Sequence, residues 1–240
     1  MPGLGTLINV ALIIAGGTAG LIGGQFITTR VQDALLKASA LCVLFIGLSG
    51  ALEKMLVFDN EKLTSTGSTM IIVSFAAGAL MGEALNLERH MERIGEWLRD
   101  RFANGAEGGF VDAFVTTSLT VCIGAMAIVG SIQDGILGDW STLALKGALD
   151  CIIVCAMTAS MGRGAIFSAL PVGVFQGTIT LLARFIQPIM TAEALDNLSL
   201  VGSMLIFCVG VNLIWGRTFK TANLLPAVVV AVVWALVCGA

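Results

Sequence analysis

Long apolar runs, each closed by charged residues or turn residues, follow one another along the chain. A membrane-spanning helix needs about 20 mostly apolar residues, so each run predicts one span. The eight predicted spans are Leu4 to Phe26, Ala34 to Val57, Ser68 to Leu85, Phe110 to Ile132, Leu143 to Met161, Ala165 to Ile186, Leu198 to Trp215 and Ala222 to Gly239. The expected fold is an all-α bundle of seven or eight membrane helices, forming a single integral membrane domain over residues 1–240.

The fifth and sixth runs leave two arrangements open. They meet at Gly162-Arg163-Gly164 with almost no linker. They form either a tight hairpin of two helices or a short re-entrant helix followed by a full span. Irregular backbone at this depth has to face protein or water, because lipid offers it no hydrogen bonds.

Composition supports a membrane protein and argues against a nucleic-acid partner. Of the 240 residues, 57% are hydrophobic and 12% are charged, against about 45–50% and about 25% in a soluble domain. The net charge is only −3, and the 13 Lys and Arg residues gather at the ends of the runs. The expected partner is therefore the lipid bilayer. Whether copies of the chain associate into a homo-oligomer is left open.

Positive charges in the short loops predict an orientation, because cytoplasmic loops carry an excess of Lys and Arg. If the loop after the first run is cytoplasmic, nine of these residues lie inside and four lie outside. The four outside are Lys54, Lys62, Lys146 and Arg184. This bias predicts that both termini lie outside the bacterial inner membrane.

The longest loop, residues 86–109, has an amphipathic helical pattern. Its apolar residues Leu87, Met91, Ile94 and Leu98 recur at spacings of three or four, with charges between them. Such a helix is expected to lie along the cytoplasmic membrane surface, with Trp97 near the interface. A helix that docks a partner protein is the alternative.

A weak internal similarity suggests an inverted repeat. Residues 39–49 in the second run resemble residues 202–212 in the seventh. An offset of five spans gives the two copies opposite directions, a plan that recurs in transporters. A true repeat predicts that spans one to three and six to eight superpose after a half-turn, with Gly47 equivalent to Gly210. Chance likeness between two glycine-containing helices is the alternative.

The first run combines a stripe of small residues with a polar amide. Gly16, Gly20 and Gly24 recur every four residues, a pattern that usually serves close helix packing rather than contact with a solute. Asn9 is a candidate for the solute or ion pathway, because an amide in hydrocarbon needs a partner.

Few polar residues lie at membrane depth, and such residues are functional candidates. Lys146 and Asp150 are four residues apart and share a helix face, so they are either part of a pathway or an ion pair that satisfies itself. Gln176 lies beside a glycine and a turn and a half after Pro171, as in a kinked helix that lines a cavity. The predicted pathway residues are Asn9, Lys146, Asp150, Gln176 and Asn212. Glu83 and Asp134 fall near the surfaces, where solvation is expected.

Enzyme and metal signatures are missing from the sequence. The single histidine, His90, lies in the long loop, and no phosphate-binding loop or CxxC pair occurs. We expect no enzyme activity, no cofactor and no metal site.

The order of several short motifs along the chain is similar to that of a known family. The motifs are Gly5-Thr6 with Asn9, Gly124-Ala125-Met126, Gly130-Ser131, Asp134-Gly135, Lys146 to Asp150, Ser168-Ala169 with Pro171 and Gln176, and Asn223 to Ala227. In this order they resemble the YqgA and YdfK type of bacterial inner-membrane protein, a domain of unknown function (554). The resemblance covers nearly the whole chain. It implies a multi-pass inner-membrane protein and supplies no substrate and no catalytic residue.

Two hypotheses for the function follow. The first is a secondary transporter or channel for a small solute or ion. The second is a membrane scaffold or sensor that presents the Arg-rich loop to cytoplasmic partners. A polar cavity at Asp150 and Gln176 that water can enter favours the first, and a dry core favours the second.

The charge bias gives a testable topology. Single cysteines at Asp59 and Asn104, in a background without other cysteines, should differ in labelling by a thiol reagent that cannot cross the membrane. We expect Asp59→Cys to react from outside and Asn104→Cys to react only after the membrane is opened. The reverse pattern would overturn the predicted orientation.

Overall fold

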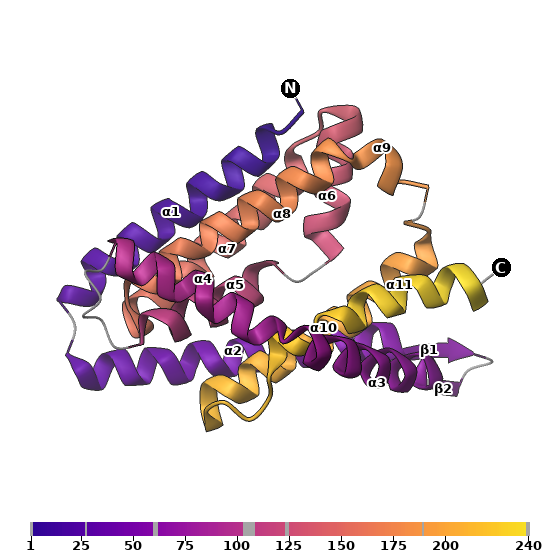
Figure 1. Cartoon of the computed structure of the whole chain (residues 1–240), viewed down its shortest axis with the longest axis horizontal. Helices are drawn as coiled ribbons and strands as arrows, with labels where there is room; N and C mark the ends of the chain where they lie inside the picture. Colours follow the sequence, from indigo (N-terminus) through magenta and orange to yellow (C-terminus); the bar gives the residue numbers. More distant parts are fainter. Residues whose placement is uncertain are drawn as a thin grey trace.

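In the computed structural model the helices lie side by side in two bundles (Figure 1). The structure describes residues 2–26, 28–59, 62–102, 109–122, 125–188 and 190–238. Asn104, Gly124 and Gly239, which the sequence analysis used, lie outside the described residues.

The elements follow one another as below. The helices are α1 (Leu4–Gln25), α2 (Thr29–Met55), α3 (Ser68–Leu85), α4 (Leu87–Phe102), α5 (Phe110–Cys122), α6 (Ala125–Leu137), α7 (Ser141–Met161), α8 (Ala169–Leu181), α9 (Ala183–Ile186), α10 (Ala192–Trp215) and α11 (Pro226–Cys238). Two 3-10 helices, η1 (Arg163–Ser168) and η2 (Thr221–Leu224), precede α8 and α11. Strands β1 (Leu56–Asp59) and β2 (Lys62–Ser65) form an antiparallel hairpin between α2 and α3.

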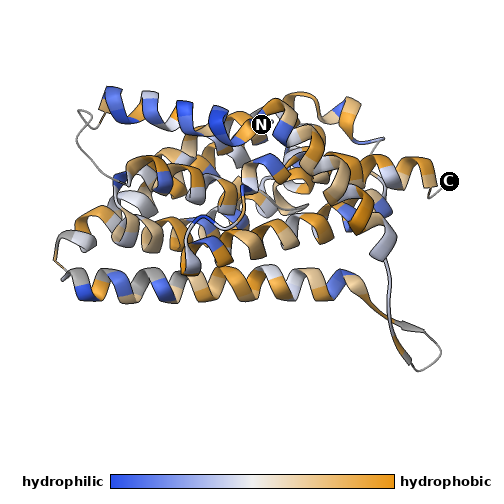
Figure 2. Ribbon diagram, turned by 60° about the horizontal axis from the view of Figure 1, so that its bottom comes forward, coloured by the Kyte–Doolittle hydropathy of each residue, from blue (hydrophilic) through white to orange (hydrophobic). Residues whose placement is uncertain are grey.

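The predicted all-α membrane bundle is confirmed. Within the described residues, six helical segments are long and apolar enough to cross a membrane, or seven if α5 and α6 form one bent span. Many large apolar side chains point outward, among them Ile72, Leu80 and Leu181, which are 68%, 76% and 85% exposed. Exposed apolar surface on this scale marks a lipid-facing surface. Figure 2 shows hydrophobic residues along the middle of α2 and hydrophilic ones near its ends.

The predicted fourth span, Phe110 to Ile132, falls on two helices, α5 and α6, which lie at an angle of 64° to each other. The pair is therefore a broken span or a re-entrant segment rather than one straight helix. Hydropathy does not register this break, since the residues on both sides of it are apolar. The fifth and sixth runs instead form a hairpin of two separate helical segments, which turns at Gly162 with a φ of +97°.

The first bundle, here the α1–α7 bundle, consists of α1, α5, α6, α7, η1 and α8. Its most extensive contact is between α1 and α7, which run parallel. A Cβ added at Gly16 would meet the backbone carbonyl of Cys151, and one added at Gly20 would meet that of Cys155. One turn further, a Cβ at Gly24 would lie 3.3 Å from the Cα of Ala159. The glycine stripe therefore lies directly against the α7 backbone.

The second bundle, here the α2–α10 bundle, consists of α2, α3, α10, η2 and α11. In it, α2 packs against α10 and α3 against α11. A Cβ added at Gly47 would meet the backbone nitrogen of Phe207, and one added at Gly210 would lie 2.7 Å from the Cα of Leu44. The two glycines thus take equivalent places in one antiparallel crossing. The superposition of the three-helix units stays a prediction.

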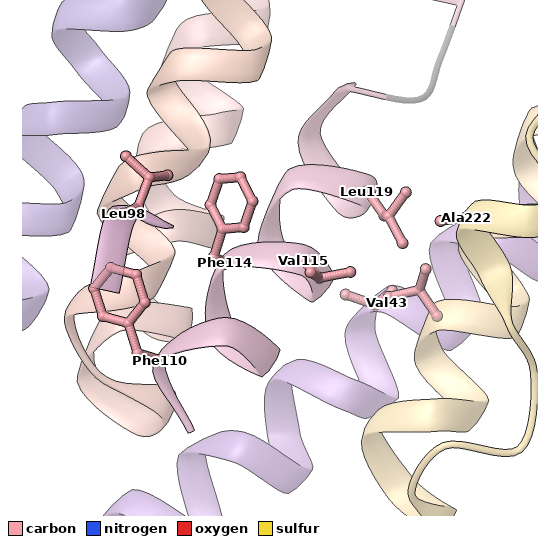
Figure 3. Close-up of a cluster of buried hydrophobic side chains, with 8 residues drawn as sticks. Val43, Leu98, Phe110, Phe114, Val115, Leu119 and Ala222 are labelled. Carbon is pink, nitrogen blue, oxygen red and sulfur yellow. The ribbon is translucent and has the colours of Figure 1, made fainter. Parts of the chain in front are cut away.

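Helix α4 and a buried cluster are among the contacts between the two bundles. The cluster draws on α2, α4, α5, α10 and η2, and most of its members are labelled in Figure 3: Val43, Leu98, Phe110, Phe114, Val115, Leu119, Val209 and Ala222. Leu98 of α4 is fully buried in it, whereas Trp97 is 62% exposed. The predicted amphipathic helix therefore packs part of its apolar side on the protein. Its position relative to the membrane surface stays a prediction.

The close contact between α1 and α7 predicts a strong effect of a single methyl group. Gly20→Ala should force the two helices apart, because the added Cβ has no room beside the Cys155 carbonyl. Overpacking of this kind costs about 1–3 kcal/mol. The matched control is Gly23→Ala on the same helix, where nothing beyond the helix's own backbone lies within 4 Å of the added Cβ. Equal unfolding temperatures for the two purified variants would contradict this packing.

Candidate functional site

The break between α5 and α6 exposes backbone carbonyls inside the α1–α7 bundle. The last carbonyls of a helix have no partner within it. At the end of α5, the Lys146 Nζ of α7 donates a hydrogen bond of 2.7 Å to the carbonyl oxygen of Val121. A charged side chain thus reaches the C-terminal end of a broken helix, where the helix dipole favours a positive charge.

The same ammonium group pairs with a carboxylate one turn away. Lys146 donates to Asp150 Oδ2, and the two side chains are only 8% and 6% exposed. The shared helix face that the spacing predicts is therefore present, and it is buried. A charge at this depth costs several kcal/mol unless it is paired. The pair, with the Val121 carbonyl, supplies that compensation.

Asn9 of α1 lies against this pair because Gly147 lets α1 approach. A Cβ added at Gly147 would lie 3.0 Å from the Asn9 Cα and 3.3 Å from its Oδ1. The Asn9 side chain is fully buried and interacts with the Asp150 carboxylate. Its amide nitrogen and oxygen nevertheless have no hydrogen-bond partner of normal geometry in the protein.

Gln176 is a second buried amide without a partner. It is 0% exposed, and neither Nε2 nor Oε1 makes a hydrogen bond within the protein. Val172, one turn earlier on α8, packs in a cluster with Ile13 and Val121. Gln176 therefore lies on the side of α8 that faces α1 and the end of α5. The structure does not join it to the Lys146–Asp150 pair by a hydrogen bond.

Buried polar atoms without partners are concentrated in one bundle. Within the described residues, eleven buried side-chain atoms lack a hydrogen-bond partner, and they belong to Thr6, Asn9, Thr117, Ser118, Asp134, Thr158, Ser168, Gln176 and Thr180. All nine residues lie on α1, α5, α6, α7, η1 or α8. Buried polar groups are normally satisfied by protein or by bound water. The interior of the α1–α7 bundle therefore has hydrogen-bond donors and acceptors that are free to bind water or a polar solute.

Two parts of this site were missed or undervalued by the sequence analysis. Asp134 was expected to be solvated, yet it is 0% exposed, and its Oδ2 accepts hydrogen bonds from the backbone N–H groups of Gly3 (3.0 Å) and Gly5 (3.1 Å). It thus binds the first turn of α1, where the helix dipole favours an anion. The hydroxyl-rich stretch of residues 116–120 in α5 was a second signal.

Asn212 does not join the buried group. Its Nδ2 donates to the carbonyl of Phe219 (2.7 Å) and to Thr221 Oγ1 (3.1 Å). Its Oδ1 accepts from the backbone N–H groups of Thr218 (3.0 Å) and Phe219 (2.8 Å). The structure therefore gives Asn212 the task of holding the turn that follows α10.

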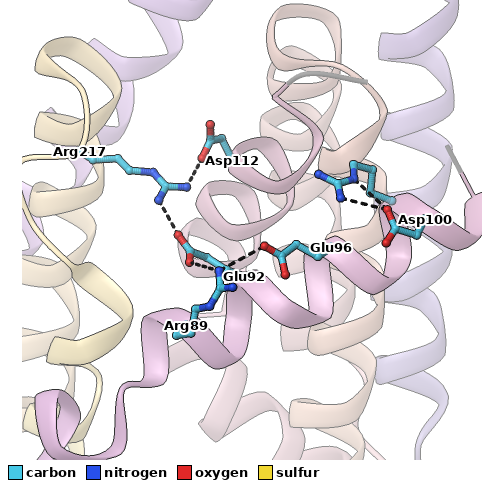
Figure 4. Close-up of polar contacts among 7 residues, drawn as sticks. Arg89, Glu92, Glu96, Asp100, Asp112 and Arg217 are labelled. Atoms are coloured by element: carbon cyan, nitrogen blue, oxygen red, sulfur yellow. Dashed lines mark hydrogen bonds and ion pairs between the residues drawn. The ribbon is translucent and has the colours of Figure 1, made fainter. Parts of the chain in front are cut away.

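Beside this turn, ion pairs connect the two bundles through α4 (Figure 4). Arg217 pairs with Glu92 of α4 and with Asp112 at the start of α5. Arg89 also pairs with Glu92, at 3.3 Å, and with Glu96, at 3.2 Å. Partial burial raises the pKa of Glu92, but the hydrogen bonds from Arg217 and Arg89 outweigh it and hold the pKa below its ordinary value.

A small cavity lies at the same place. It measures about 200 Å³, and Glu88, Asp112, Asn212 and Arg217 line its polar part. Burial raises the pKa of Glu88 above that of an exposed glutamate, although the backbone N–H of Ala222 and the charge of Arg217 oppose the rise. The folded protein therefore holds the Glu88 proton to a higher pH than an exposed glutamate does.

Comparison with known proteins adds the family. Residues 4–236 match a family described as "Protein of unknown function (DUF554)". The chain belongs to the DUF554 family. It is 28% identical over 227 residues to the "Uncharacterized membrane protein YdfK" of Bacillus subtilis (strain 168), covering 94% of this chain and 93% of the relative. It is 25% identical over 232 residues to the "Uncharacterized protein YqgA" of Escherichia coli (strain K12), covering 95% and 94%. No solved structure matches the chain.

The DUF554 membership confirms the resemblance inferred from the order of motifs. In this DUF554 protein most motif residues at membrane depth fall into the α1–α7 bundle, including Asn9, Asp134, Asp150 and Gln176. The last motif lies in η2 and α11, where a Cβ added at Gly82 of α3 would meet the Asn223 carbonyl.

The role of Asn212 in the turn can be tested by stability. Asn212→Ala should lower the free energy of unfolding by about 1–3 kcal/mol, because the N–H groups of Thr218 and Phe219 lose their acceptor. Asn197→Ala on the same helix removes one hydrogen bond of 3.3 Å, to the Ala231 carbonyl, and is the control. Thermal melting of the purified variants measures the difference. A melting temperature for Asn212→Ala at or above that of Asn197→Ala would contradict the assignment.

Proposed function

We propose that this DUF554 protein is a secondary transporter or channel that moves a small solute or ion through the α1–α7 bundle. The observation that carries the proposal is the location of the unpartnered buried polar atoms, all of which belong to that bundle among the described residues. Burying polar atoms without a hydrogen bond costs free energy. Along a path for a polar solute, the same atoms can form hydrogen bonds with that solute.

The broken span supports the same proposal. Transporters commonly form their sites from discontinuous helices, whose ends and freed carbonyls contact the solute or the coupling ion. Here the end of α5 meets Lys146, Asp150 and Asn9 within one region. We favour transport over catalysis because the site is rich in hydrogen-bonding groups, whereas the sequence has no recognisable pair of catalytic nucleophile and base.

The setting of this activity is part of the proposal. We place the protein in the bacterial inner membrane with both termini outside, on the basis of the bias of Lys and Arg toward the inner loops. Because Lys146 is buried in α7, nine of these residues inside stand against three outside. The equivalent positions of Gly47 and Gly210 at the α2–α10 crossing support an inverted repeat. In this reading the α2–α10 bundle is the apolar frame against which the solute-binding bundle is held.

The scaffold or sensor remains the competing function, and α4 is where the two hypotheses differ. Five charged residues of α4 form ion pairs with one another or with Arg217, which follows α10: Arg89, Glu92, Glu96, Arg99 and Asp100. Charges engaged in this way are less available to a docking partner. Exposed Trp97 is the feature of α4 that a partner would contact.

Flux measurements test the proposal. The purified protein is placed in liposomes and screened against a panel of ions and metabolites. Asp150→Asn and Gln176→Leu should each reduce flux to the level of protein-free liposomes while the protein still folds. The double variant Lys146→Met, Asp150→Leu should be inactive too, although exchange of a whole buried ion pair for apolar residues is often nearly neutral for stability.

A second carboxylate serves as the matched control. Asp196 of α10 pairs with Lys54 in the last turn of α2, at 2.8 Å. The Asp196 side chain is 59% exposed. Asp196→Asn removes the same charge from the other bundle and should leave flux unchanged. Full flux in the folded Lys146→Met, Asp150→Leu variant would overturn the proposal in favour of a structural ion pair.

A further inference from the structure

Two oxygens hold the Lys146 ammonium: the Val121 carbonyl of α5 at 2.7 Å and the Asp150 carboxylate of α7. The Asn9 amide of α1 lies beside that carboxylate, and its Oδ1 has no hydrogen-bond partner in the protein. Carbonyl, carboxylate and amide oxygens are all groups that bind cations. No second buried carboxylate contributes to this set among the described residues.

We propose that these groups form a binding site for a small monovalent cation, which the Lys146 ammonium occupies when no free cation is bound. A bound cation displaces Lys146 as the neutral amine, and the released proton passes to water, so one positive charge still balances Asp150. The proposal rests on the proposed function, because it names the class of ion that the same site takes. It goes beyond an internal ion pair, since an ion pair needs neither the broken helix nor Asn9.

The end of α5 is the first reason for a cation. The carbonyls at a helix C-terminus carry a partial negative charge, and half-helix C-terminal ends coordinate cations in transporters. Lys146 already shows that this position accepts a positive charge. A free cation would gain the same two oxygens without the constraint of a side chain.

Asn9 is the second and independent reason. It is fully buried beside Asp150, yet neither of its polar atoms is satisfied by the protein. Gly147 gives it room to lie there, at a contact where a side chain would not fit. An ammonium held by Val121 and Asp150 leaves the Asn9 oxygen unused, whereas a free cation can take it as a third ligand.

The charge of the site indicates a monovalent ion. Asp150 is the single carboxylate of the set, so one positive charge balances it, and an unbalanced charge at membrane depth is costly. Ca²⁺ takes six to eight oxygens, usually with several carboxylates. Among the described residues, the Cys122 thiol also interacts with the pair, but it offers sulfur rather than oxygen. Divalent ions are therefore poor candidates.

Removal of the tethered ammonium tests the proposal directly. Lys146→Met leaves the oxygens in place and should create a site whose occupancy stabilises the fold. We measure thermal unfolding of the detergent-purified variant in the chloride salts of Li⁺, Na⁺, K⁺, Rb⁺ and NH₄⁺, with N-methyl-D-glucamine chloride at equal ionic strength as the reference. At about 100 times its dissociation constant, the preferred cation should raise the unfolding temperature by about 5–10 °C.

The controls separate this site from general salt effects. Wild-type protein should respond less, because its own ammonium competes for the same oxygens. Lys146→Met, Asp150→Asn should not respond, because the carboxylate is gone. Lys54→Met removes a lysine from the exposed ion pair with Asp196 and should behave as wild type. Mg²⁺ and Ca²⁺ should add nothing beyond ionic strength.

Every outcome decides the question. If Lys146→Met is too unstable to purify in the reference salt, recovery of folded protein in one of the small cations supports the site, and failure in all of them overturns it. An equal response in Lys146→Met, Asp150→Asn also overturns it. If Asp150→Asn abolishes the flux of another solute while no monovalent cation stabilises Lys146→Met, the cation site falls and the transport proposal stands.

Discussion

Backbone contact between α1 and α7 is the interaction on which the candidate site depends. Two helices reach this separation only where side chains are absent, and the stripe of Gly16, Gly20 and Gly24 provides that on α1. The same contact continues to Gly147 of α7, which admits Asn9. If the two helices lay further apart, Asn9 could not approach the Asp150 carboxylate. Close packing and the polar site are therefore one feature of the fold.

The hydrocarbon surroundings explain the difference between the two bundles. In the α2–α10 bundle the buried cluster is apolar, and it includes Met70, Leu200 and Val201. In the α1–α7 bundle the interior holds a lysine, two aspartates and two unpartnered amides. Because polar atoms at this depth are costly, their gathering in one bundle leaves the other free to face lipid and to support it. The ion pairs of Arg217 join the two at one end.

The sequence alone predicted the helices better than the contacts between them. Apolar runs located most spans, and the four-residue spacing predicted that Lys146 and Asp150 share a face. The break after Cys122 was not predicted, because hydropathy is the same on both sides of it. The approach of Asn9 depends on α1 meeting α7, which no local pattern encodes.

Asn212 was grouped with the pathway residues because it is polar within an apolar run, whereas the structure uses it to hold a turn. Asp134 was undervalued because its burial comes from the first turn of α1.

The parallel pairing of α1 with α7 also has a consequence for biosynthesis. The ribosome makes α1 first, and α2 to α6 must follow before any residue of α7 exists. During that time the glycine face of α1 has no partner of its own chain and borders lipid or the insertion machinery. The same holds for α2 and α3, whose partners α10 and α11 are the last long helices to be made. Neither bundle can therefore close while the nascent chain is still short, and the order of synthesis differs from the order of packing.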